Sequence, residues 1–133
     1  MTYFSDASAR KLETCVTPLQ NLFNEVIKSN DCIIICGYRG PIAQNKAYNS
    51  GHSKVKYPNS CHNSYPSSAI DVAPYFRDAP HIRWANANAF YYFAGYVFRV
   101  AKEMDISLRW GGNWDGEEIE RQNFFDGVHF ELV

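Results

Sequence analysis

The stretch that decides the fold is Ser60-Cys61-His62-Asn63-Ser64-Tyr65-Pro66-Ser67-Ser68-Ala69-Ile70-Asp71-Val72-Ala73-Pro74. Its first half is polar and rich in turn formers, whereas residues 69–73 are a run of strand formers. Because side chains alternate along a strand, Ile70 and Val72 face one side of a sheet and Asp71 faces the other. The stretch therefore predicts a loop carrying His62, followed by a strand with a carboxylate on its polar side.

A second alternation occupies the C-terminal residues 126–133, where apolar positions flank His129 and Glu131. This pattern predicts a terminal strand with His129 on its polar face. Two His and one Asp from separate segments can form an open zinc site of the catalytic kind. A His–Asp pair is more often a simple hydrogen bond or surface polarity, so the pattern alone does not decide between the two.

The order and spacing of these residues carry a family resemblance. The motif residues are, in order, Ser60-x-His62, Ala69-x-Asp71 and Asp126-x-x-His129. They resemble the zinc peptidases of the D-Ala-D-Ala peptidase/hedgehog-like family, and most of all its L-alanyl-D-glutamate endopeptidases, which serve as phage endolysins. The resemblance runs from the first helix to the last residue. It implies an α+β fold, a small mostly antiparallel sheet with packed helices, and a single zinc peptidase catalytic domain over residues 1–133.

The resemblance also implies a catalytic centre. It makes His62, Asp71 and His129 the ligands of one Zn²⁺, with water in the fourth position. Asp126 matches the family's catalytic carboxylate, which takes a proton from the water and passes it to the leaving amine. Arg39 matches the residue that steadies the oxyanion.

Further residues match the rim of the family's cleft. Tyr38 and Gln44 belong to a Gly-Tyr-Arg turn with a Gln five residues after the Arg, and Trp114 lies in a Trp-bearing loop near the site. These residues and Ser60, which is expected to orient the loop of His62, are predicted to contribute to substrate binding. Glu131 shares a strand face with His129 and is expected to support it or the sheet.

Two features depart from the family pattern or extend it. The loop between His62 and Asp71 looks longer by two residues and lacks a glycine.

Some phage relatives hold a regulatory calcium ion after the Trp-bearing loop. The acidic residues there are Asp115, Glu117, Glu118 and Glu120. Because calcium needs six to eight converging oxygens, a solvated acidic face is the favoured interpretation of this short segment.

The composition of the chain limits the classes of protein to which it can belong. The chain has 133 residues, 46% of them hydrophobic, and a net charge of −1, which suits one folded domain and argues against nucleic-acid binding. The sequence contains no membrane-spanning run, and its polar residues 1–10 are not typical of a signal peptide. We therefore expect a monomer made in the host cytoplasm, without membrane insertion. It would reach the bacterial peptidoglycan with a holin-type helper.

The four cysteines are expected to be buried or idle thiols. Cys32 and Cys36 flank a predicted strand, which puts them roughly 13 Å apart, too far for a disulfide or a shared zinc. Cys61 adjoins His62 but should point away from it.

Periodicity predicts the remaining elements. Residues 7–28 show helical spacing, interrupted where Thr17-Pro18 resembles an N-cap and first helical residue. A strand over 32–36 and a helix from Pro41, closed by Gly51, follow. A helix over 84–103 carries an aromatic stripe that is more often core than a sugar platform, and a strand follows over 106–110.

Three functions are consistent with the resemblance. The first is a zinc endopeptidase that hydrolyses the L-Ala–D-Glu bond of peptidoglycan stem peptides and lyses the wall. The second is a D-Ala-D-Ala carboxypeptidase or dipeptidase, whose members typically carry Glu where this chain has Asp126. The third is a non-catalytic wall-binding module, which would be expected to lack a ligand or base.

Overall fold

The computed structural model describes residues 2–114 and 125–133. Its helices are α1 (Asp6–Leu12), α2 (Thr17–Val26), α3 (Pro41–Asn49) and α4 (Ala87–Glu103), with a short 3₁₀ turn, η1 (Cys61–Asn63). Its strands are β1 (Cys32–Cys36), β2 (Ala69–Pro74), β3 (Leu108–Trp110) and β4 (His129–Leu132). The strands form one sheet in the order β1-β2-β4-β3, and each neighbouring pair is antiparallel. The predicted α+β fold class is confirmed.

The central strand β2 is buried along its whole length because β1 and β4 flank it. On its apolar side Ile70 and Val72 join the hydrophobic core. On its other side Asp71 lies directly opposite His129 of β4. The alternation expected around Asp71 and His129 therefore places two of the three predicted metal ligands side by side on one face of the sheet.

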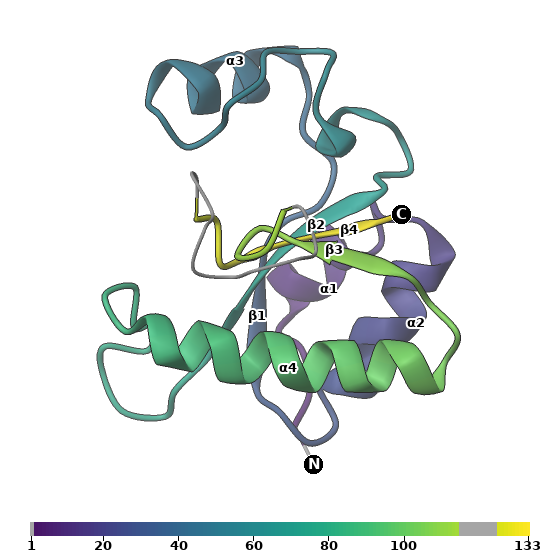
Figure 1. Cartoon of the computed structure of the whole chain (residues 1–133), viewed down its shortest axis with the longest axis vertical. Coiled ribbons are helices and arrows are strands. Elements are labelled where there is room, and N and C mark those ends of the chain that lie inside the picture. The colour runs from purple at the N-terminus through teal and green to yellow at the C-terminus, as the bar shows by residue number, and fades with distance from the viewer. Residues whose placement is uncertain (1, 115–124) are drawn as a thin grey trace.

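Helices α2 and α4 form the hydrophobic layer behind the sheet. α4 buries residues spaced three and four apart, including Phe93 and Val97, and contacts both α2 and β2. The rings of Phe23 and Phe93 meet Phe130 of β4 edge to face. Figure 1 shows α2 and α4 together on one side of the sheet, with α3 standing apart on the other. The aromatic stripe of α4 is thus mostly core, as expected.

Several predicted boundaries shift by one to three residues. Helix α4 begins at Ala87 because the Asn86 side chain caps it by accepting a hydrogen bond from the Ala89 N–H. It ends before Asp105, whose positive φ of 57° turns the chain away, so β3 starts at Leu108 instead of Ile106. At α2, Val16 is the N-cap and Thr17 is already helical.

Among the described residues, no helix is both long and apolar enough to cross a bilayer.

Candidate metal centre

The turn η1 presents His62 to the face of the sheet that carries Asp71. Ser60 caps this turn: its hydroxyl accepts a hydrogen bond from the His62 N–H, and its own N–H donates to the Asn63 side chain. The imidazole of His62 is 2% exposed, and its Nδ1 lies 2.7 Å from the carbonyl oxygen of Gly37. These two hydrogen bonds agree with the expectation that Ser60 orients the loop of His62.

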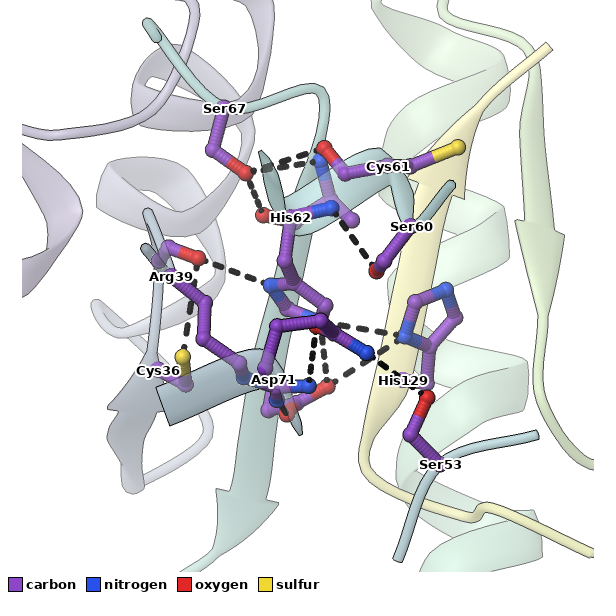
Figure 2. Close-up of polar contacts among 12 residues, drawn as sticks. Cys36, Arg39, Ser53, Ser60, Cys61, His62, Ser67, Asp71 and His129 are labelled. Atoms are coloured by element: carbon purple, nitrogen blue, oxygen red, sulfur yellow. Dashed lines mark hydrogen bonds and ion pairs between the residues drawn. The ribbon is translucent and has the colours of Figure 1, made fainter. Parts of the chain in front are cut away.

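Three ligand atoms converge between η1, β2 and β4. His62 Nε2 lies 3.1 Å from Asp71 Oδ1 and 3.2 Å from His129 Nδ1. His129 Nδ1 lies 3.4 Å from the same carboxylate oxygen. Figure 2 shows the three side chains pointing toward one another from their separate elements. The structure thus brings together all three residues predicted as metal ligands.

The hydrogen bond on the far side of each imidazole ring determines whether the nitrogen that faces the centre has a free lone pair. His62 Nδ1 faces a carbonyl oxygen, which can only accept, so that nitrogen carries a proton. His129 Nε2 lies 2.7 Å from Glu131 Oε1 and likewise donates. In their neutral forms, both rings then present bare lone pairs to the Asp71 carboxylate. Three acceptors then face one another, an arrangement that a metal ion between them, or a proton on one of the rings, would satisfy.

The donor set fits a zinc ion. Ligand atoms about 2.0–2.2 Å from a tetrahedral zinc lie roughly 3.3–3.5 Å apart, close to the separations seen here. The pKa shifts of the same side chains also suit a cation at this centre. Burial by itself lowers the pKa of His62, but the Asp71 carboxylate outweighs it and raises that pKa to about 10. Burial by itself raises the pKa of Asp71, but His62 and His129 hold it well below its ordinary value. The centre therefore favours positive charge.

Glu131 connects the centre to the edge of the sheet. One carboxylate oxygen accepts the hydrogen bond from His129, and the other lies 3.4 Å from Arg109 Nη1 on β3 and 3.6 Å from the Cys61 thiol. A carboxylate behind a metal-binding histidine fixes its ring and raises its basicity. The structure therefore gives Glu131 the supporting position that its strand face predicted.

Asp126 lies beside the ligands at the start of the turn into β4. Its ligand-capable oxygen, one from Asp71 and the nitrogen of His129 lie within 4.8 Å of one another. Burial, reinforced by the nearby Asp71 carboxylate, raises the pKa of Asp126 to about 6. A carboxyl group in this position can exchange a proton with a group held at the centre.

Two glycines, for which the sequence analysis predicted no packing role, lie in tight contacts at these positions. A Cβ on Gly111 would lie 2.2 Å from the Asp126 carbonyl oxygen, and the Gly111 backbone bonds to both Asp126 and His129. A Cβ on Gly37 would lie 2.3 Å from the Thr14 hydroxyl. The only signal in the sequence is a glycine directly after a predicted strand.

Arg39, which is partly buried, and Gln44, which is fully buried, form a hydrogen-bonded pair next to the centre. The Arg39 guanidinium donates to Asp71 Oδ2 at 3.1 Å and to Gln44 Oε1 at 3.1 Å. Gln44 is fully buried and its amide nitrogen donates to Ser53 and to the Val55 carbonyl. Gln44 thus lies behind the cleft wall and holds other residues, which differs from its predicted contact with substrate.

A cavity of about 370 Å³ opens over the centre, and its wall includes His62, His129, Asp126, Arg39 and Trp114. Ser60 also lines it, and the Trp114 ring lies against that of His129, with centroids 5.0 Å apart. A larger hollow between α4 and β3 shares Trp114 but contains none of the three ligands. The cavity of about 370 Å³ over the three ligands is therefore the candidate active site.

Other predictions have mixed outcomes. Tyr38 lies outside the described wall of this cavity; it packs edge to face on Tyr65 of the longer loop. All four cysteines are free, and Cys61 points to Glu131, away from the ligands. Cys36, expected to be idle, has its sulfur near His62 and Asp71. The acidic residues weighed as a calcium site lie in 115–124, outside the described residues.

Comparisons with known proteins identify the family of the chain. The model of the family "Phage L-alanyl-D-glutamate peptidase" matches residues 1–133. The L-alanyl-D-glutamate peptidase of Escherichia phage T5 is 32% identical over 139 aligned positions, covering 98% of this chain and 97% of the relative.

Two solved structures share the fold. The Serratia marcescens L-Ala D-Glu endopeptidase ChiX superposes with a TM-score of 0.76 at 23% identity, covering 98% of this chain and 89% of ChiX. The vancomycin-resistance D,D-dipeptidase VanXYg, solved with a D-Ala-D-Ala phosphinate analogue, gives 0.52 at 21% identity over 99% of this chain and 51% of its own. With the family model matching from end to end, the chain is a peptidase that belongs to the phage L-alanyl-D-glutamate peptidase family.

Proposed function

We propose that this peptidase is a zinc-dependent endopeptidase that cuts the L-Ala–D-Glu bond of peptidoglycan stem peptides. One observation carries the proposal: His62, Asp71 and His129 point three acceptor atoms at one point, 3.1–3.4 Å apart, inside a cavity that also contains Asp126. Membership of the family and the name of the phage T5 relative support the choice of bond.

In this proposal His62, Asp71 and His129 hold the zinc ion. Zinc supplies a Lewis acid that polarises the scissile carbonyl and makes a water molecule acidic near neutral pH. The protein keeps the three ligands in place through their outer hydrogen bonds. Gly37 holds His62, Glu131 holds His129, and Arg39 holds the second oxygen of Asp71.

Asp126 is the proposed general base. Its carboxylate lies beside the ligands and lines the cavity, so it can take a proton from the attacking water and return it to the leaving amine. Arg39 presents the cavity with a guanidinium that Asp71 and Gln44 orient. We assign to Arg39 the stabilisation of negative charge that develops on the scissile carbonyl.

The rim residues take different parts. Trp114 forms a wall beside His129, and Ser60 stabilises the turn that carries His62. We assign Gln44 a positioning role behind the wall. Tyr38, packed on Tyr65, would contact only the outer part of a long substrate.

The proposed setting is the bacterial cell wall, which a monomer made in the host cytoplasm would reach with a holin-type helper. Residues 1–133 would act as a single catalytic domain.

The test is digestion of purified peptidoglycan, followed by mass spectrometry of the released products and of their new amino termini. The proposal expects a new D-Glu amino terminus and loss of the product in Asp126→Asn. Free D-Ala would instead identify a carboxypeptidase or dipeptidase. Release of nothing from several wall types by zinc-loaded protein would point to a binding module.

A further inference from the structure

The bond proposed for cleavage lies close to a sugar. L-Ala of a stem peptide is joined through its nitrogen to the lactyl group of N-acetylmuramic acid, so one amino acid and one lactyl unit separate the bond from the sugar ring. Each unit spans at most roughly 3.3–3.6 Å, which puts the ring within about 7 Å of the bond. A site that cuts stem peptides on the glycan strand must therefore leave room for a sugar ring near its metal centre.

The hollow between α4 and β3 offers such room. Its volume is about 600 Å³, within the usual size of small-molecule sites. Trp114 lines both this hollow and the cavity over the metal ligands. Its ring centroid lies 5.0 Å from that of His129, which is within the reach of the lactyl and L-Ala units. The hollow and the candidate active site therefore meet at Trp114.

The wall of the hollow has the chemistry that a sugar ring needs. The C–H face of a sugar packs on aromatic rings, whereas its hydroxyl and acetamido groups need hydrogen-bond partners. Phe98 is 37% exposed, so the protein covers its ring only in part. Arg109 and Asn113 add polar groups to the same wall. Its aromatic members are Tyr91, Phe98, Trp110 and Trp114.

Gly95 leaves space in this wall. It lies inside α4, where residues 91, 95 and 98 share one helical face and all line the hollow. Glycine in a helix interior is destabilising relative to alanine. A Cβ at Gly95 would meet nothing within 4 Å, and its φ is not positive, so neither tight packing nor backbone conformation calls for glycine there. Room for a bound ring gives this position a physical reason.

We propose that the hollow between α4 and β3 binds the N-acetylmuramic acid ring of the glycan strand, and so makes the enzyme prefer stem peptides that still carry their sugar. This inference rests on the proposed function and specifies its substrate class. Gly95 contributes space, and the aromatic side chains contribute the packing surface. The lactyl and L-Ala units pass Trp114 and bring the scissile bond to the metal centre.

The experiment compares two synthetic substrates that differ only in the sugar. One is an N-acetylmuramoyl stem peptide, and the other is the same peptide capped with D-lactate alone. We expect wild-type kcat/KM to favour the sugar-bearing substrate about tenfold, the effect of one ring packed on an aromatic face. Gly95→Leu should fill the hollow and bring the ratio close to one, while turnover of the lactyl peptide stays at the wild-type level. Phe98→Ala should also lower the ratio.

Two variants serve as controls. Gly95→Ala adds one methyl group and should keep most of the preference. Tyr92→Leu places leucine at an α4 position that is 74% exposed and outside the described wall of the hollow, so it should keep the wild-type ratio. Because leucine favours a helix more than glycine does, Gly95→Leu should be at least as stable as the wild type, which thermal unfolding measures.

An unchanged ratio in Gly95→Leu, an equal loss of turnover for both substrates, or a wild-type ratio of one would each overturn the inference. Failure of the wild type to cut either substrate at the L-Ala–D-Glu bond would instead overturn the proposed function, on which the inference depends.

Discussion

His62 and His129 face the same centre through different ring nitrogens, Nε2 in one and Nδ1 in the other. In each ring the remaining nitrogen donates to an oxygen of the protein, a backbone carbonyl for His62 and the Glu131 carboxylate for His129. These outer bonds select the tautomer that can bind a metal. A mutation can remove the Glu131 carboxylate but not the backbone carbonyl of Gly37. A Glu131 variant can therefore test whether the outer hydrogen bond supports metal binding.

We predict that Glu131→Ala weakens zinc affinity by about 10–100-fold, because His129 loses the partner that fixes its ring. Glu131→Gln should fall between Ala and wild type, since an amide oxygen can still accept from His129. Competition with a chromophoric zinc chelator measures the affinity. Glu103→Gln is the control, because Glu103 is exposed and pairs with Arg99 on α4. Wild-type affinity in Glu131→Ala would contradict the prediction.

For Asp126→Asn we expect kcat to fall by about 10²–10⁴-fold, the usual contribution of a general base, while zinc content and stability are kept. The amide can preserve the shape of the turn but cannot take a proton from water. Turnover of a stem peptide and metal analysis of the same sample measure the two effects. Asp78→Asn, at an exposed position, serves as control. Near-normal activity would remove Asp126 from the mechanism.

At the scale of elements, the site depends on how closely separate segments approach. The chain leaving β3 passes so near to the turn before β4 that position 111 has no room for a side chain. The backbone of Gly111 accepts from the Asp126 N–H and donates to the His129 carbonyl. One residue thereby ties the proposed base and a proposed metal ligand to the edge strand.

Gly111→Ala should therefore cost about 1–3 kcal/mol of stability, as overpacking does, and should lower activity by displacing Asp126. Denaturant unfolding and peptide turnover measure the two effects. Gly95→Ala is the matched control, since a Cβ there meets nothing within 4 Å and alanine favours a helix by up to about 1 kcal/mol. A Gly111→Ala protein with wild-type stability and activity would contradict the prediction, because it would show that the turn before β4 can shift to make room for a methyl group at little cost in free energy.

Across the whole molecule, the proposed metal joins segments that are distant in sequence: η1, the central strand β2 and β4. Such a metal binds the folded chain far better than the unfolded one. We predict that zinc at a thousand times its Kd raises the unfolding free energy by about 4 kcal/mol relative to chelator-stripped protein. The His129→Ala variant should lose most of its zinc and most of this gain. Melting that zinc leaves unchanged in the wild type would contradict the metal assignment.

The sheet and the shared face of Asp71 and His129 were predictable because they follow from local alternation. His62 lies on a loop, and only the family resemblance grouped it with them. Around Asp71 and around His129 the apolar residues occupy every second position, so the face of each polar residue was fixed by the chain itself. Element ends were less predictable. They depend on single capping contacts, such as the Asn86 side chain and the positive φ of Asp105.

The surroundings of the site were harder to predict because they depend on segments that meet only after folding. Nothing local shows that Gln44 lies behind the wall, since its burial depends on the loop that folds over it. The same holds for Gly37 and Gly111, whose tight neighbours, Thr14 and Asp126, are far away or beyond a loop.

The position of β4 has a consequence for synthesis. This strand fills the gap between β2 and β3 and carries both His129 and its carboxylate partner. A nascent chain on the ribosome that has not yet released β4 holds only two of the three proposed ligands, and its sheet lacks the strand between β2 and β3. A fragment that ends before β4 therefore cannot assemble the proposed centre, which forms only after β4 has joined the sheet.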